Sequence, residues 1–173
     1  MGPRAALGAG FAFLIGCQPN STRPAITPVP EAAAAEIRLR PQEAIQRLAE
    51  ALAADSLPPA RVRVRDAYLE TAWLDSATGR PVARRPIGSD EVKLRAWADP
   101  GRPGNTVLIV ETLYRPLADP SLPERELERQ VSREHPASLK VERILAAMLE
   151  RYGGPPRPQP QPAGPGASGE SEE

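Results

Sequence analysis

Residues 91–114 read EVKLRAWADPGRPGNTVLIVETLY, and this stretch decides the fold. Apolar side chains alternate with charged or aromatic ones over residues 91–98, which predicts a strand. Aspartate, proline, glycine and asparagine then predict a hairpin-type loop over residues 99–105. The apolar run at residues 106–114 is typical of a central strand that is covered, at least in part, on both sides.

The segments that flank these strands have different periods. Residues 41–55 and residues 137–152 carry apolar side chains at helical spacing, so each predicts an amphipathic helix. Residues 61–75 alternate as a strand does, but in two phases. The change of phase predicts a bulge or tight turn near Arg65 and Asp66, between a short strand and a longer one.

The order of these elements is a helix, three or four antiparallel strands and a second helix. We therefore predict an α+β fold, a two-layer sandwich in which both helices pack on one face of the sheet. The polar segment 115–136 is predicted to be a long loop, with a short helical piece within residues 122–131.

Four segments are expected along the chain. Residues 1–16 are interpreted as a lipoprotein signal peptide, residues 17–40 as a lipid-anchored cysteine with a proline-rich tether, and residues 41–152 as the α+β domain. Residues 153–173 contain no apolar residue larger than alanine or proline, which predicts a disordered, acidic tail. Whether this tail binds a partner as a polyproline helix is left open.

The N-terminal segment carries a lipidation motif. Arg4 precedes an apolar run that is too short to span a bilayer but fits a secretory signal. The run ends in Leu14, Ile15, Gly16 and Cys17, which resembles the lipobox of bacterial lipoproteins. The resemblance implies recognition of these residues by a signal peptidase, cleavage before Cys17 and lipidation of its thiol. The alternative is an ordinary signal peptide with an unrelated cysteine.

The residue after the cysteine bears on localisation. Residue 18 is glutamine, whereas an aspartate at this position commonly retains such lipoproteins at the inner membrane. The resemblance therefore implies a lipid-anchored protein on the periplasmic face of the outer membrane. Two or more acyl chains anchor a protein stably, so the membrane is the first predicted partner.

The folded part resembles a known accessory domain of the envelope. Residues 64–73 read VRDAYLETAW and are similar to the first hairpin of the BamC-like domain, where an acidic turn residue precedes a strand that ends in tryptophan. The resemblance covers about residues 42–152 and is architectural. It implies a role beside the machinery that assembles outer-membrane β-barrels, and it supplies no catalytic or binding residue.

The sequence offers little for catalysis. The chain has one histidine, His135, and its one cysteine is assigned to the lipid, so a His-dependent triad and a Cys/His zinc site are disfavoured. Lys and Arg number 22 and Asp and Glu number 22, and this zero net charge argues against nucleic acid as a partner. We predict a protein that is not an enzyme, with no cofactor, no metal and no small-molecule substrate.

A candidate partner surface lies on the predicted helix-free face of the sheet. If Val92 and Leu94 face the helices, then Lys93, Arg95 and Trp97 face outward. The next strand is expected to turn one of two apolar sets outward, either the odd-numbered or the even-numbered residues of 107–114. The surface is either a contact site for another protein or is covered by the 115–136 loop.

A second candidate surface is basic. Arg61, Arg63 and Arg65 alternate with valines and share one strand face. They either form a solvated face that protects a sheet edge, or contact anionic headgroups and lipopolysaccharide phosphates. The favoured hypothesis is a protein-interaction module in envelope or outer-membrane protein assembly. The alternative is a lipid- or lipopolysaccharide-binding lipoprotein in envelope transport.

Overall fold

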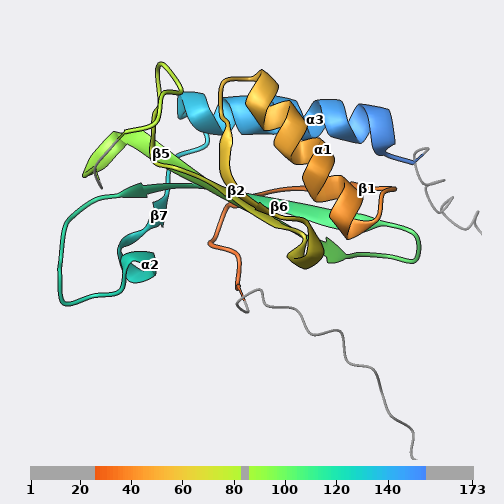
Figure 1. The fold of residues 1–173 in the computed structure, drawn as a ribbon, viewed down its shortest axis with the longest axis horizontal. Helices are drawn as coiled ribbons and strands as arrows, with labels where there is room; N and C mark the ends of the chain where they lie inside the picture. Colours follow the sequence, from red (N-terminus) through yellow and green to blue (C-terminus); the bar gives the residue numbers. More distant parts are fainter. Residues whose placement is uncertain (1–25, 83–85, 155–173) are drawn as a thin grey trace, which may run out of the picture.

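The structure, a computed structural model, describes residues 26–82 and 86–154 (Figure 1). Within these residues an antiparallel sheet of seven strands is accompanied by three α-helices and one 3-10 turn. The strands are β1 (Ala33–Ile37), β2 (Pro59–Arg63), β3 (Tyr68–Thr71), β4 (Leu74–Asp75), β5 (Gly88–Pro100), β6 (Thr106–Arg115) and β7 (Arg129–Gln130). The helices are α1 (Pro41–Ala54), α2 (Glu124–Leu127) and α3 (Pro136–Tyr152), and the 3-10 turn is η1 (Val64–Asp66).

The predicted fold class is wrong in the number of strands and helices. The sheet has seven strands where three or four were expected, and the described residues contain three helices where two were expected. The two long helices and the strands of the opening stretch lie where the sequence places them. The additional elements are β1 and the two-residue strands β4 and β7, whereas α2 lies where a short helical piece was expected within residues 122–131.

Strand β1 changes the N-terminal boundary of the folded part. It consists of AAAEI, and alanine has no preference for strands, so local propensity does not reveal it. It pairs antiparallel with β6, with Ala35 opposite Leu108. Because this strand falls within residues 17–40, the segment assigned to the tether contributes an edge strand to the sheet.

The sheet order is β1-β6-β5-β3-β2, with β4 paired to β5 and β7 paired to β6. Alternate residues of the long strands therefore face opposite sides. Leu94, Ala96 and Ala98 lie on one side of β5, where they face the helices and join the main core. Odd-numbered residues of β6 lie on the other side, because Glu111 is opposite Arg95 and Ile109 is opposite Trp97. The first of the two expected sets thus faces away from the helices.

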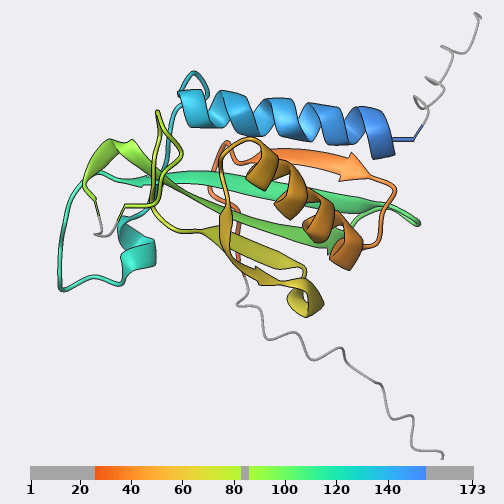
Figure 2. The ribbon, with the colours of Figure 1, turned by 45° about the horizontal axis from the view of Figure 1, so that its top comes forward.

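Helices α1 and α3 cover the same face of the sheet (Figures 1 and 2). Helix α1 begins at Pro41, which suits a first helical turn, and buries Ile45, Leu48 and Leu52 completely. Helix α3 buries Val141 and Leu145 among other residues against the same core. Full burial of such a side chain stabilises the fold by about 1.5–3 kcal/mol, so the two helices and the sheet hold one another by apolar contact.

The local turns follow the sequence pattern. The predicted turn near Arg65 and Asp66 is confirmed as η1, and Ala67 after it takes a left-handed conformation with φ of 47°. This turn allows β2 and β3 to pair with each other despite their different phases. His135 caps α3, since its Nδ1 accepts a hydrogen bond from the Ala137 N–H at 3.2 Å and its Nε2 contacts the Ser89 carbonyl oxygen at 2.9 Å. The lone histidine therefore has a structural task.

Candidate functional site

The sheet face opposite the long helices is covered over β5 and β6. Trp97 is 0% exposed and Arg95 is 6% exposed, so the expectation that they form an open partner surface with Lys93 is wrong. The segment that precedes β1 crosses this face, and the Val29 N–H donates a hydrogen bond of 2.9 Å to Glu111. The loop after β6, with α2 and β7, covers another part of it (Figure 1).

An ion network holds these coverings to the sheet. Arg95 contacts Oε2 of Glu111 through Nε and Nη2, both at 2.6 Å, and it contacts Glu128 through Nη1 at 2.7 Å. Lys93 donates to the other oxygen of Glu128 at 3.1 Å. Glu111 is 0% exposed, and it reaches both the sheet cation and the backbone of the N-terminal segment.

The network explains why Arg95 and Lys93 point away from the helices without reaching solvent. Burial opposes the charge of Arg95, but the facing carboxylates outweigh it, so the pKa of the Arg95 guanidinium stands above its ordinary value. Lys93 also lies 5.8 Å from the centre of the Trp73 ring. The pattern of alternation was read correctly, but the acids that cover these cations come from segments 16 and 33 residues away.

The same face holds a tyrosine with a raised pKa and a tryptophan whose indole N–H makes no hydrogen bond. Burial, reinforced by the negative charge of Glu70, raises the pKa of the Tyr68 hydroxyl from 10.0 to about 12. Tyr68 lies opposite Trp97 in the sheet. The Trp97 Nε1–H is buried and makes no hydrogen bond, so this tryptophan contributes by packing alone. We interpret the buried part of this face, over β3, β5 and β6, as structural.

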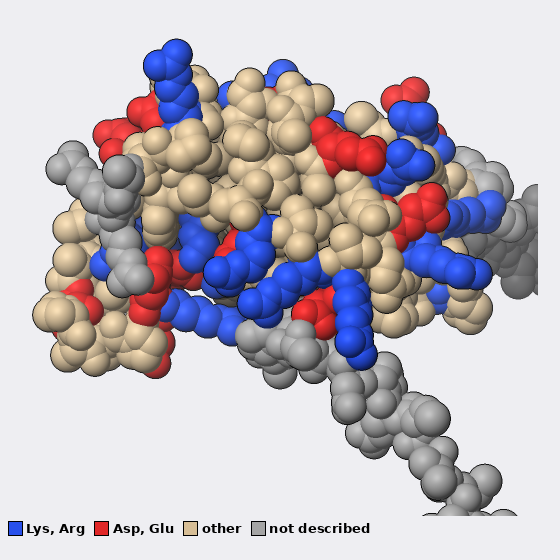
Figure 3. All heavy atoms as spheres, viewed as in Figure 1, with Lys and Arg blue, Asp and Glu red and all other residues tan. Residues whose placement is uncertain are grey.

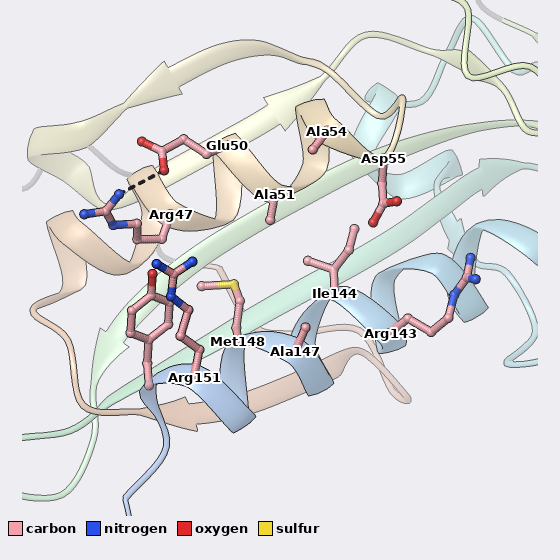
Figure 4. Close-up of a pocket in the computed structure, with 11 residues that line it drawn as sticks. Arg47, Glu50, Ala51, Ala54, Asp55, Arg143, Ile144, Ala147, Met148 and Arg151 are labelled. Atoms are coloured by element: carbon pink, nitrogen blue, oxygen red, sulfur yellow. Dashed lines mark hydrogen bonds and ion pairs between the residues drawn. The ribbon is translucent and has the colours of Figure 1, made fainter.

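A groove lies on the other side of the molecule, between α1 and α3 (Figure 4). Its volume is about 590 Å³. Small and apolar side chains form its floor, and they are Ala51, Ala54, Ile144, Ala147 and Met148. Because three of the five are alanines, a bound group can approach both helix backbones closely.

Charged side chains stand along the rim of the groove. Figure 4 shows Arg47 and Arg151 near one end, and Asp55 with Arg143 toward the other. Arg47 pairs with Glu50 on its own helix at 3.1 Å, and this hydrogen bond raises the pKa of its guanidinium. Arg151 stacks on the ring of Tyr152, with 5.3 Å between the guanidinium carbon and the ring centre. Three arginines against two acids leave a small positive excess over an apolar floor.

Sequence reasoning did not find this groove. It depends on how α1 and α3 lie beside each other, and no local pattern specifies that arrangement. A weak signal was present, because alanines at positions 51, 54 and 147 occupy helix positions beside buried residues without filling the space there. Small residues next to arginines on two amphipathic helices are consistent with a shallow site.

Several predicted site residues lie outside the described residues. The lipobox residues Leu14, Ile15, Gly16 and Cys17 belong to this part of the chain, and so does most of the predicted tail. Within residues 26–82 and 86–154, no helix combines the length and the apolar character that crossing a bilayer requires. The same described ranges contain no group of three or more histidine, cysteine, aspartate or glutamate side chains placed to hold a metal ion.

Comparison with known proteins assigns neither a family nor a function to the chain. No protein-family model, no curated protein and no solved structure matches the chain. The resemblance to lipoproteins at residues 14–17 and the architectural resemblance to a BamC-like domain therefore stay predictions.

Proposed function

We propose that this chain is a non-enzymatic lipoprotein, anchored through Cys17 on the periplasmic face of the outer membrane, that binds a protein partner in envelope or outer-membrane protein assembly. The observation that carries the proposal is the groove between α1 and α3, with its alanine-rich floor and arginine rim. The groove takes the role that was predicted for the surface of Lys93, Arg95 and Trp97. That surface cannot contact a partner, because Arg95 and Trp97 are buried.

The groove suits an amphipathic segment of a protein. A helix that lies between two others places its apolar stripe on the floor and its charged flanks on the rim. The floor here is apolar, and the rim offers the guanidinium groups of Arg143 and Arg151 to acidic side chains. Since α1 and α3 are already fixed by the core, the site needs little ordering on binding.

The predicted anchor adds to this affinity without adding contacts. A lipid on Cys17 confines the domain to the membrane surface, which raises its effective concentration toward partners in the same membrane. A groove with only a small charge excess then suffices for binding in place. The two parts of the proposal, the anchor and the groove, are separable by experiment.

Site-specific photocrosslinking in cells tests the groove. A photoreactive residue at Ala54 or Ala147, both exposed in the groove, is expected to form an adduct with one envelope protein. The matched control is Ala77, an exposed alanine in the loop after β4, where no adduct is expected. Equal adducts at Ala54 and Ala77, or none at either groove position, would contradict the proposal.

A variant of Cys17 tests the lipid anchor in the same experiment. Cys17→Ser is expected to move the protein from the membrane to the soluble fraction when the membranes are washed with high salt, and to reduce the Ala54 adduct. If Cys17→Ser still fractionates with membranes after the high-salt wash, which releases ionic contacts, the lipid anchor is refuted while the groove stands. The alternative function, binding of lipid or lipopolysaccharide for transport, predicts that the Ala54 adduct contains lipid and no protein.

A further inference from the structure

The edge of the sheet that β2 forms carries exposed basic side chains. Arg61, Arg63 and Arg65 are all exposed, on β2 and the adjoining η1. Arg61 and Arg63 lie on the side away from the long helices, since they pair in the sheet with Glu70 and Tyr68, whose neighbours are Arg95 and Trp97. Figure 3 shows basic side chains gathered over this part of the molecule.

On the side of this edge away from the helices, the arginines are more exposed than the acid that faces them. Arg61 is 57% exposed and pairs with Glu70 at 2.9 Å, while the carboxylate side chain of Glu70 is only 19% exposed. Asp66 of the adjoining η1 is buried. The exposed acids Glu43 and Glu50 lie on the helix side of β2, where they line a hollow with Val62. On the side away from the helices the guanidinium groups therefore extend beyond the carboxylate of Glu70, which favours contact with a surface of phosphates over contact with a cationic partner.

The N-terminal end of the described chain leaves the fold on this same side. Residues 26–32 cross the helix-free face, where Val29 binds Glu111, and the chain leaves away from α1 and α3 (Figure 1). Cys17 precedes Ile26 by nine residues, which reach about 30 Å at full extension. A lipid on Cys17 would therefore lie within about 30 Å of Ile26, where the described chain ends on the side that carries the arginines.

From this arrangement we infer that the Arg61, Arg63 and Arg65 edge docks on anionic phospholipid headgroups and turns the α1–α3 groove away from the membrane. The inference rests on the proposed function only for the anchor, because the contact itself involves described residues. Guanidinium groups bind phosphate oxygens in pairs of hydrogen bonds, and each cation near an anionic leaflet strengthens binding about fivefold. The orientation leaves the groove open to the periplasmic parts of partners that lie in the same membrane.

Vesicle flotation of the mature Cys17→Ser chain tests the contact without the lipid anchor. It is expected to bind vesicles that contain phosphatidylglycerol, to release them as salt rises, and to bind phosphatidylethanolamine vesicles much less. The double variant Arg63→Gln, Arg65→Gln is expected to bind roughly 25-fold more weakly, fivefold for each arginine. Circular dichroism confirms that the variants are folded.

The matched control removes two cations from the helix side. Arg133→Gln with Lys140→Gln changes the net charge equally at residues that line hollows beside α3, and it is expected to bind vesicles as the parent does. Equal loss in both double variants, or equal binding to both vesicle types, overturns the inference. A protein adduct from a photoreactive residue at Val62, without vesicle binding, also overturns it and identifies the edge as a site for a protein strand. None of these results affects the Ala54 crosslink, so the failure of each proposal is visible separately.

Discussion

The two faces of the sheet consist of alternate residues of the same strands, yet different forces hold their coverings. Toward the long helices, β5 presents Leu94, Ala96 and Ala98, and apolar contacts hold the helices to the sheet. Toward the N-terminal segment and the 116–128 loop, it presents Arg95 and Lys93, which bind carboxylates. On the helix face, the burial of apolar surface area stabilises the fold. On the opposite face, the ion pairs hold two irregular segments in fixed positions.

This difference has an energetic consequence. An apolar face tolerates a change of side chain as long as the volume is kept, because its contacts have no direction. A buried ion pair depends on each partner, since the loss of one leaves the other charged and without compensation in the interior. Isosteric substitutions on the two faces therefore separate the two kinds of packing.

The largest effect is expected on the charged face. Glu111→Gln keeps the shape of the side chain but removes one of the two carboxylate charges that face Arg95. We expect the free energy of unfolding to fall by about 3 kcal/mol, the low end for a broken buried pair, because Glu128 still pairs with Arg95. Urea denaturation measures it, with Glu150→Gln on the exposed side of α3 as the control that changes it by less than about 0.5 kcal/mol. A loss below about 1 kcal/mol for Glu111→Gln would show that the network contributes little.

A smaller effect is expected on the helix face. Leu94→Met nearly conserves volume at a fully buried position, and we expect a loss of less than about 1.5 kcal/mol in the same urea measurement. Leu149→Met, at a leucine that is 48% exposed, serves as the control with almost no change. If Leu94→Met is as costly as Glu111→Gln, the two faces do not differ in the way described.

A further effect appears only at alkaline pH. The pKa of Tyr68 is about 12 in the folded chain, above the ordinary value of 10.0, because burial favours the neutral phenol. A raised folded pKa stabilises the fold below pH 10, and this contribution is lost as pH rises from about 10 to about 12. Tyr68→Phe is expected to remove this part of the alkaline loss, whereas Tyr152→Phe retains it. Phenolate absorbance that titrates at the ordinary value for Tyr68 would contradict the prediction.

The same comparison shows what the sequence can predict. Helices α1 and α3 have clear periods, because each buries one face and exposes another. Strands β5 and β6 are covered on both faces, and they are recognisable by the alternation of apolar with charged side chains in β5 and by the apolar run in β6. Strand β1 has no such signal, since AAAEI becomes a strand only by pairing with β6. Strands β4 and β7 have two residues each, too few for any period.

The candidate site was harder to predict for a physical reason. The alternation of residues along β5 predicts that Arg95 and Trp97 lie on the face away from the helices. It does not predict which segments cover that face. Glu128 lies in a loop whose pattern gives no indication that it returns to the sheet. The α1–α3 groove likewise exists only in the packed molecule, because its two sides are far apart in sequence.

The most direct measurement is the yield of the Ala54 crosslink in cells that make the lipidated chain, with and without Arg143→Glu and Arg151→Glu. If the groove receives an acidic amphipathic segment of a partner, the adduct with one envelope protein forms in the parent and falls at least about tenfold in the double variant, because like charges then face each other at the rim. An adduct of unchanged yield in the variant, or no protein adduct in the parent, would contradict the account.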